Sequence, residues 1–146
     1  MKYCKIRESH KIKPIPGEAL PHRNSIKTLL IVDDSRVSRM MIRAFVLAKH
    51  PQWIIIEAAS GNEALEVVDR DTPNYCTMDI NMPGIIGTEA AAQILVKYPG
   101  IRIAVFSANI QESHQTRAAA LGARFVAKPV TEKSVAQALE FFESQK

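Results

Sequence analysis

The sequence predicts an α/β fold, namely a doubly wound, five-stranded parallel sheet with helices on both faces. Its 146 residues, of which 47% are hydrophobic, fit one domain with one core. Five short apolar runs alternate with segments whose apolar residues recur at helical spacing. Because helical connections between parallel strands are right-handed, this alternation favours the flavodoxin-like strand order 2-1-3-4-5.

The first strand leads directly into the first helix. The apolar run Thr28–Val32 is followed by Asp33 and Asp34, and a helical pattern then extends from Arg36 towards Pro51. The apolar residues of this pattern are Val37, Met40, Met41, Ala44 and Leu47. We expect the two methionines to fill the core rather than to form a binding surface.

A second and a third strand follow. Residues 53–57 predict the second strand, and Ser60 with Glu63 predicts a capping box at the start of the next helix. The run Tyr75–Asp79 predicts a buried strand that is closed by a tight turn at residues 82–84. This turn is Met-Pro-Gly, in which Pro cannot donate to a sheet and Gly accepts turn dihedral angles.

The second half of the chain repeats the pattern. A third helix ends before Pro99, and residues 101–106 predict the fourth strand. Residues 110–121 predict a helix with a thin apolar stripe, which suits either an element held loosely enough to shift or a marginal helix without a signalling role. Residues 123–127 predict the fifth strand, and Thr131 is expected to cap the last helix.

Polar side chains stand at the ends of four predicted strands. Asp33 and Asp34 follow the first, Asp79 ends the third, Ser107 follows the fourth and Lys128 follows the fifth. Ligands bind at this carboxyl edge in open α/β sheets. Two carboxylates about 4 Å apart repel by roughly 1 kcal/mol in bulk water and roughly 4 kcal/mol at an effective dielectric near 20. Such a cluster calls for a cation, and Mg²⁺ prefers oxygen ligands of this kind.

One chemistry uses all of these groups. A carboxylate can accept a phosphoryl group while a metal and a lysine neutralise its charge and a hydroxyl hydrogen-bonds the product. Four motifs in this order and at these separations resemble a two-component response-regulator receiver domain: Val32-Asp33-Asp34-Ser35, Met78-Asp79-Ile80-Asn81-Met82-Pro83-Gly84, Ser107-Ala108 and Lys128-Pro129. The resemblance covers roughly residues 27–142.

The resemblance implies a role for each matching residue. Asp79 would accept a phosphoryl group from a sensor histidine kinase or a phosphotransfer protein. Asp34, Asp79 and the backbone carbonyl of Asn81 would bind Mg²⁺, and Asp33 would assist through water. Lys128 would contact the phosphoryl group.

The resemblance also implies a switch. Ser107 would move towards the phosphoryl group, and Phe125, at the aromatic switch position, would fill the space that it leaves. The altered surface near the fourth helix and last strand would bind an unidentified downstream protein. The sequence departs from the pattern at Asn74 and Ile86, where relatives often carry acids, but neither residue touches the proposed chemistry.

Charge divides the chain into a basic, Pro-containing leader (residues 1–26) and a receiver domain (residues 27–146), with no output domain expected. Residues 1–27 carry seven Lys and Arg against two acidic residues, whereas residues 28–146 carry twelve against thirteen. The leader shows no sustained periodicity, so it is expected to be irregular or extended. It is either an arm that touches a partner or a solvated tail or strap.

Composition also bounds the location and the partners. Cys4 and Cys76 are far apart and Cys76 lies in a predicted buried strand, so we expect no disulfide and a cytoplasmic protein. No segment resembles a transmembrane helix or a secretion signal, so no membrane association is expected. A basic leader alone supports no specific nucleic-acid binding. We expect a monomer or a weak dimer that is not an enzyme, although it catalyses its own phosphoryl uptake and hydrolysis.

Other functions remain as alternatives. The chain could be an adaptor of the same fold that is never phosphorylated, and Asp33 and Asp34 could merely cap the first helix. A phosphatase with an aspartyl nucleophile is disfavoured because such enzymes generally resemble an Asp-x-Asp pattern, whereas these two acids are adjacent. A flavin or nucleotide binder would need a first loop rich in Gly, Ser or Thr, since adjacent carboxylates repel phosphate when no metal is present.

Overall fold

Strands and helices alternate strictly along the computed structural model, which describes residues 26–144. The elements are β1 (Thr28–Val32), α1 (Arg36–Lys49), β2 (Ile54–Ala58), α2 (Gly61–Arg70), β3 (Tyr75–Asp79), α3 (Gly87–Lys97), β4 (Arg102–Ser107), α4 (Glu112–Ala120), β5 (Arg124–Ala127) and α5 (Glu132–Glu143). The predicted strands and helices are therefore confirmed. The predicted leader lies outside the described residues except for Ile26.

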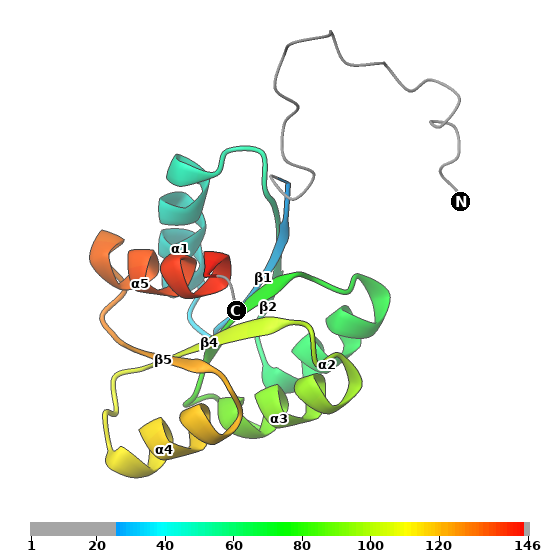
Figure 1. The fold of residues 1–146 in the computed structure, drawn as a ribbon, viewed down its shortest axis with the longest axis vertical. Coiled ribbons are helices and arrows are strands. Elements are labelled where there is room, and N and C mark those ends of the chain that lie inside the picture. The colour runs from blue at the N-terminus through cyan, green and yellow to red at the C-terminus, as the bar shows by residue number, and fades with distance from the viewer. Residues whose placement is uncertain (1–25, 145–146) are drawn as a thin grey trace, which may run out of the picture.

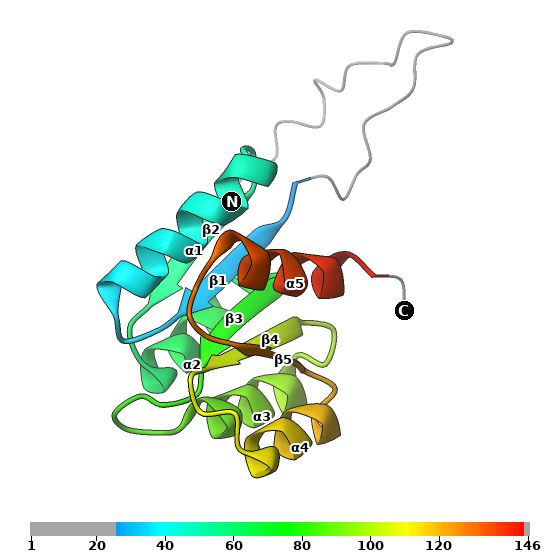
Figure 2. The ribbon, with the colours of Figure 1, turned by 90° about the vertical axis from the view of Figure 1, so that its left-hand side faces the viewer.

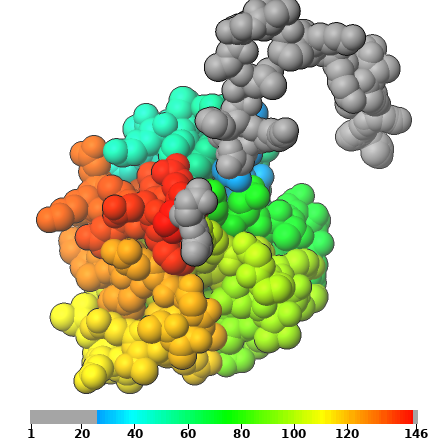
Figure 3. Space-filling model, in the orientation of Figure 1, coloured from blue at the N-terminus to red at the C-terminus, as the bar shows by residue number. Residues whose placement is uncertain are grey.

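The strands form one parallel sheet in the order β2-β1-β3-β4-β5, which confirms the predicted topology. Helices α1 and α5 cover one face of the sheet, and α2, α3 and α4 cover the other (Figures 1 and 2). On the side of the molecule shown in Figure 3, the surface of α5 lies between those of α1 and α4. Among residues 26–144, no helix combines the length and the apolar character needed to cross a membrane.

The sheet has an apolar cluster on each face, which explains why its central strands are almost continuously apolar. In β1, Leu30 and Val32 pack towards α2 and α3, whereas Leu29 and Ile31 pack towards α1 and α5. All five residues of Tyr75–Asp79 are buried. A strand that is buried on both faces can offer a polar side chain to a ligand only at its end. Asp79 is the last residue of this strand.

The predicted core face of α1 is wrong. Val37 and Met40 are 63% and 56% exposed, and Met41 is also exposed, whereas Ile42 and Val46 are buried. Apolar residues occur on more than one side of this helix, but only one side can face the sheet and α5. The methionines therefore lie on the surface rather than in the core.

Side chains cap most helices in the expected way. Ser35 accepts a hydrogen bond from the backbone N–H of Ser38 at the start of α1. Thr131 and Ser134 form a reciprocal capping box at the start of α5. The predicted box of α2 is only half formed, because Glu63 accepts a hydrogen bond from the N–H of Ala59 rather than from that of the cap residue. In α4 only Ala118 is buried, which confirms its thin apolar stripe.

Candidate functional site

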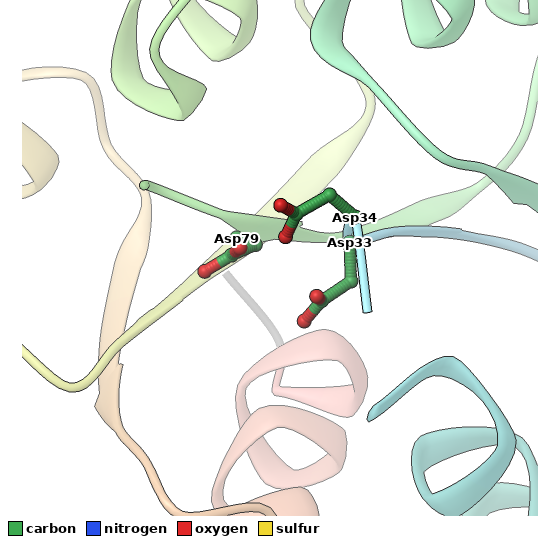
Figure 4. Close-up of side chains that lie close together, drawn as sticks. All are labelled: Asp33, Asp34 and Asp79. Carbon is green, nitrogen blue, oxygen red and sulfur yellow. The ribbon is translucent and has the colours of Figure 1, made fainter. Parts of the chain in front are cut away.

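Three carboxylates meet at the carboxyl edge of the sheet. Asp33 and Asp34 follow β1 and Asp79 ends β3, and these strands are direct neighbours with Val32 paired to Met78. One carboxylate oxygen from each of the three acids lies within 4.8 Å of the others (Figure 4). Asp33 and Asp79 are buried and Asp34 is exposed, so the cluster opens to solvent on the side of Asp34. The predicted convergence of the acids is confirmed.

Every polar group of Asp33 has a partner. Its N–H donates to the carbonyl of Ala58, and its Oδ1 accepts a hydrogen bond of 2.9 Å from the N–H of Ser35. Its Oδ2 lies 3.0 Å from Nζ of Lys128, and its carbonyl accepts a hydrogen bond from Arg39. Because Ser35 caps α1, capping does not explain why two acids stand here. Asp34 and Asp79 are the acids whose oxygens are less committed to the protein.

Lys128 joins the cluster from the end of β5. Its Nζ lies 3.0 Å from Asp33 Oδ2 and 3.4 Å from Asp79 Oδ1. The backbone N–H of Lys128 donates to the carbonyl of Ser107, which continues the pairing of β4 with β5 and holds the lysine at the same edge. The ammonium group is partly buried and lies between two carboxylates, so it is placed to neutralise negative charge that arrives at Asp79.

The acids and the lysine perturb one another. Burial and the negative charge of Asp33 raise the pKa of Asp79 to about 6, although the charge of Lys128 opposes the rise. Burial lowers the pKa of Lys128, but the hydrogen bonds and charges of Asp33 and Asp79 together outweigh it, so that this pKa is raised overall. The lysine therefore stays charged at neutral pH, and the repulsion between the carboxylates is only partly relieved by the protein.

The donor set fits a hard divalent cation. Three carboxylates within reach of one ion provide oxygen ligands of the type that Mg²⁺ prefers, and the exposure of Asp34 opens one side of the cluster to solvent. Burial, together with the negative charges of Asp33 and Asp34, raises the pKa of Asp79, so these two acids add to the cost of ionising it. A bound cation would relieve this charge.

Ser107 lies at the end of β4, and Asn81 and Asn109 are its neighbours. The Ser107 hydroxyl is fully buried and accepts a hydrogen bond of 2.9 Å from the N–H of Asn109. The side-chain amide of Asn81 donates to the same hydroxyl over 3.4 Å. The predicted metal ligand at Asn81 is its carbonyl, so its side chain is free to make this contact.

Phe125 lies two residues before the end of β5 and is half-buried. It pairs with Val105 of β4 and packs against the apolar cluster on the side of α2, α3 and α4. Ser107 pairs instead with Ala127. The register therefore places Phe125 two residues before the position on β5 that faces Ser107. The role of Phe125 as a switch stays a prediction.

Two contributors to the site were not identified from the sequence. The backbone of Gly87, at the start of α3, lies against the carbonyl of Asp79 so closely that a Cβ would overlap it. Arg39 of α1 donates to the carbonyl of Asp33. A glycine shortly after a turn and an arginine on a surface helix are common, so neither residue carries a signal in the sequence.

Comparisons with known proteins agree with this geometry. The response regulator receiver domain family matches residues 29–140. The chemotaxis protein CheY of Listeria monocytogenes is 38% identical over 113 residues, which cover 77% of this chain and 94% of the relative. CheY of Bacillus subtilis is 36% identical over 112 residues, which cover 76% and 92%. A solved CheX–CheY–BeF3–Mg²⁺ complex from Borrelia burgdorferi contains a chain with a TM-score of 0.71 and 25% identity, and the match covers 77% of this chain and 86% of that one.

Proposed function

The chain belongs to the response regulator receiver domain family, and on this premise we propose that it accepts a phosphoryl group on Asp79 from a histidine kinase or a phosphotransfer protein. A carboxylate oxygen of Asp79 attacks the phosphorus of a phosphohistidine, the P–N bond breaks, and an acyl phosphate forms. Water later cleaves the acyl phosphate and restores the carboxylate. The juxtaposition of Asp79 with two further acids and Lys128 carries this proposal.

Each neighbour has a part in the transfer. Lys128 balances negative charge on the phosphoryl oxygens, since its ammonium lies 3.4 Å from Asp79 Oδ1. Asp34, Asp79 and the carbonyl of Asn81 would hold Mg²⁺, with Asp33 assisting through water. When bound, this ion would withdraw charge from the oxygens of the phosphoryl group and orient it. The Borrelia burgdorferi complex contains Mg²⁺ together with BeF3, which supports this assignment by analogy.

Signalling follows from the charge that the phosphoryl group adds. Ser107 is buried beside Asp79's strand and can turn its hydroxyl towards the new oxygens, leaving Asn109. Phe125 then occupies space near β4, and the surface of α4 and β5 changes its population of states. The weakly buried α4 suits such a change. The downstream partner is a protein that distinguishes these states. The receiver acts in the cytoplasm as a monomer or a weak dimer.

Intact mass after incubation with Mg²⁺ and acetyl phosphate tests the function. The wild type is expected to gain the mass of one phosphoryl group, and Asp79→Asn is expected to gain none. Ser107→Ala serves as a matched variant, because it keeps the acceptor, the acids and Lys128 and should still be labelled. Labelling of both wild type and Asp79→Asn would contradict the assignment of Asp79. Labelling of neither would favour an adaptor that is never phosphorylated.

A further inference from the structure

Arg39 connects the acid pair to the neighbouring strand. It lies in the first half of α1, and its side chain is 16% exposed. Its Nε donates to Glu57 Oε1 over 2.8 Å, and its Nη1 donates to the carbonyl oxygen of Asp33 over 2.7 Å. One guanidinium group therefore bridges a carboxylate of β2 and the backbone that follows β1.

The second contact acts on the peptide that joins Asp33 to Asp34. The orientation of this peptide sets the direction in which the Asp34 side chain leaves the backbone. The carboxylate of Asp33 accepts hydrogen bonds from Ser35 and Lys128 and is thus held separately. Within residues 26–144, the side chain that donates to the Asp33 carbonyl is that of Arg39. Asp34 itself is exposed, so burial does not fix its side chain.

Glu57 holds Arg39 in this position. It pairs with Ile31 in the sheet, so its backbone is fixed relative to β1. Because the fork of a guanidinium is rigid, binding Glu57 through Nε aims Nη1 at a defined point, and that point is the carbonyl of Asp33. Glu57 Oε2 also accepts a hydrogen bond of 3.3 Å from Arg43 Nη1. The side chain of Arg43 is 46% exposed and does not reach the acid pair.

We propose that Arg39 is a positioning residue of the cation site, in that it holds the Asp33–Asp34 peptide so that Asp34 can bind the metal together with Asp79. The inference rests on the proposed function, which supplies Mg²⁺ as the cation. Arg39 exerts two effects of opposite sign. Its positive charge opposes cation binding, whereas its contact with the carbonyl of Asp33 preorganises the ligands. The proposal requires that the positional effect be the larger one.

The sign of the change in Mg²⁺ affinity tests this requirement. The dissociation constant of Mg²⁺ is measured by calorimetric titration of wild type, Arg39→Met, Arg39→Lys and Arg43→Met, at a temperature where circular dichroism shows each to be folded. Arg39→Met should weaken binding about tenfold, which is the lower end of what loss of an outer contact to a metal site costs. Arg39→Lys should also weaken binding, because an ammonium lacks the fork that spans both partners.

Arg43→Met is the matched control, because Arg43 also pairs with Glu57 but does not contact Asp33. Like Arg39→Met, it removes one positive charge beside the Glu57 carboxylate. Its Mg²⁺ affinity should equal or slightly exceed that of wild type. Wild-type affinity or better in folded Arg39→Met would overturn the proposal, and Arg39→Lys decides in the same way if the methionine variant does not fold. If wild type itself binds no Mg²⁺, the proposed function fails and the inference fails with it. If wild type binds Mg²⁺ and is labelled, but both Arg39 variants bind as tightly, only the inference fails.

Discussion

At the scale of single residues, the site is a set of charges that the protein leaves out of balance. Asp79 and Asp33 are both buried, and Lys128 is the ammonium that reaches both of them. Burial and the charges of Asp33 and Asp34 raise the pKa of Asp79 to about 6, and the single positive charge of Lys128 offsets only part of this rise. A group poised in this way responds strongly to an arriving cation or phosphoryl group.

This raised pKa predicts that the ionised carboxylate of Asp79 destabilises the folded protein at neutral pH. The carboxyl has a pKa of about 6 in the folded protein against an ordinary value of 3.8, so the folded protein binds the extra proton between these values. The free energy of unfolding should therefore fall as the pH rises through this window. In the absence of divalent cations, Asp79→Asn should be more stable than wild type by about 1–3 kcal/mol near pH 7, and the gain should shrink towards pH 4.

Urea unfolding at the two pH values measures this difference. Asp69→Asn is a suitable control, because Asp69 is paired with Lys97 on the surface and the hydrogen bond from Lys97 lowers the pKa of its carboxyl. That variant should gain no stability near pH 7. A gain for Asp79→Asn that is the same at both pH values would show that ionisation of Asp79 is not its cause.

At the scale of elements, two helices show what the pattern of a sequence leaves undecided. Apolar residues occur on more than one side of α1, and only Ile42 and Val46 are fully buried. In α3 a run of small residues, including Ala90 and Ala91, lets the helix approach the sheet. The closest approach is at Gly87, whose N–H donates to the carbonyl of Ile80. The start of α3 and the end of β3 thus form one unit around Asp79.

Gly87→Ala should disrupt this unit. An added Cβ would overlap the carbonyl oxygen of Asp79 and lie 2.8 Å from Cα of Ile80, and backbone atoms cannot rotate away as a side chain can. We expect a loss of about 1–3 kcal/mol in the free energy of unfolding and slower phosphorylation, because Asp79 must shift. Gly100→Ala is the control, since its Cβ would meet nothing within 4 Å. Equal stabilities of the two variants in denaturant titrations would contradict the close contact.

At the scale of the whole molecule, the strand order brings together segments that are distant in the sequence. Strands β1 and β3 are adjacent, and β4 and β5 follow them in the sheet. Lys128 therefore contacts Asp33 across 95 positions of the chain. Any ligand held by the carboxyl edge links β1, β3 and β5, so its binding energy should appear as stability of the entire domain.

Mg²⁺ should accordingly raise the melting temperature. A ligand that binds only the folded state at about one hundred times its dissociation constant adds about 2.7 kcal/mol. Wild type should show a concentration-dependent shift by differential scanning calorimetry, and Asp34→Asn should lose most of it. Asp71→Asn, which removes an acid on the exposed end of α2, should keep the shift. A shift that Asp34→Asn retains in full would place the cation elsewhere.

The sequence by itself determined the order of the elements and the residues at the strand ends, because apolar periodicity and turn residues are local signals. Motifs of known order also predicted a site made of Asp33, Asp34, Asp79, Ser107 and Lys128, and the structure brings the three acids and Lys128 together. Only the tertiary structure decided which face of α1 is buried, that Gly87 must lie against Asp79, and that Arg39 reaches the carbonyl of Asp33. These three features depend on how one element is placed against another, and contacts between distant segments leave no local pattern in the chain.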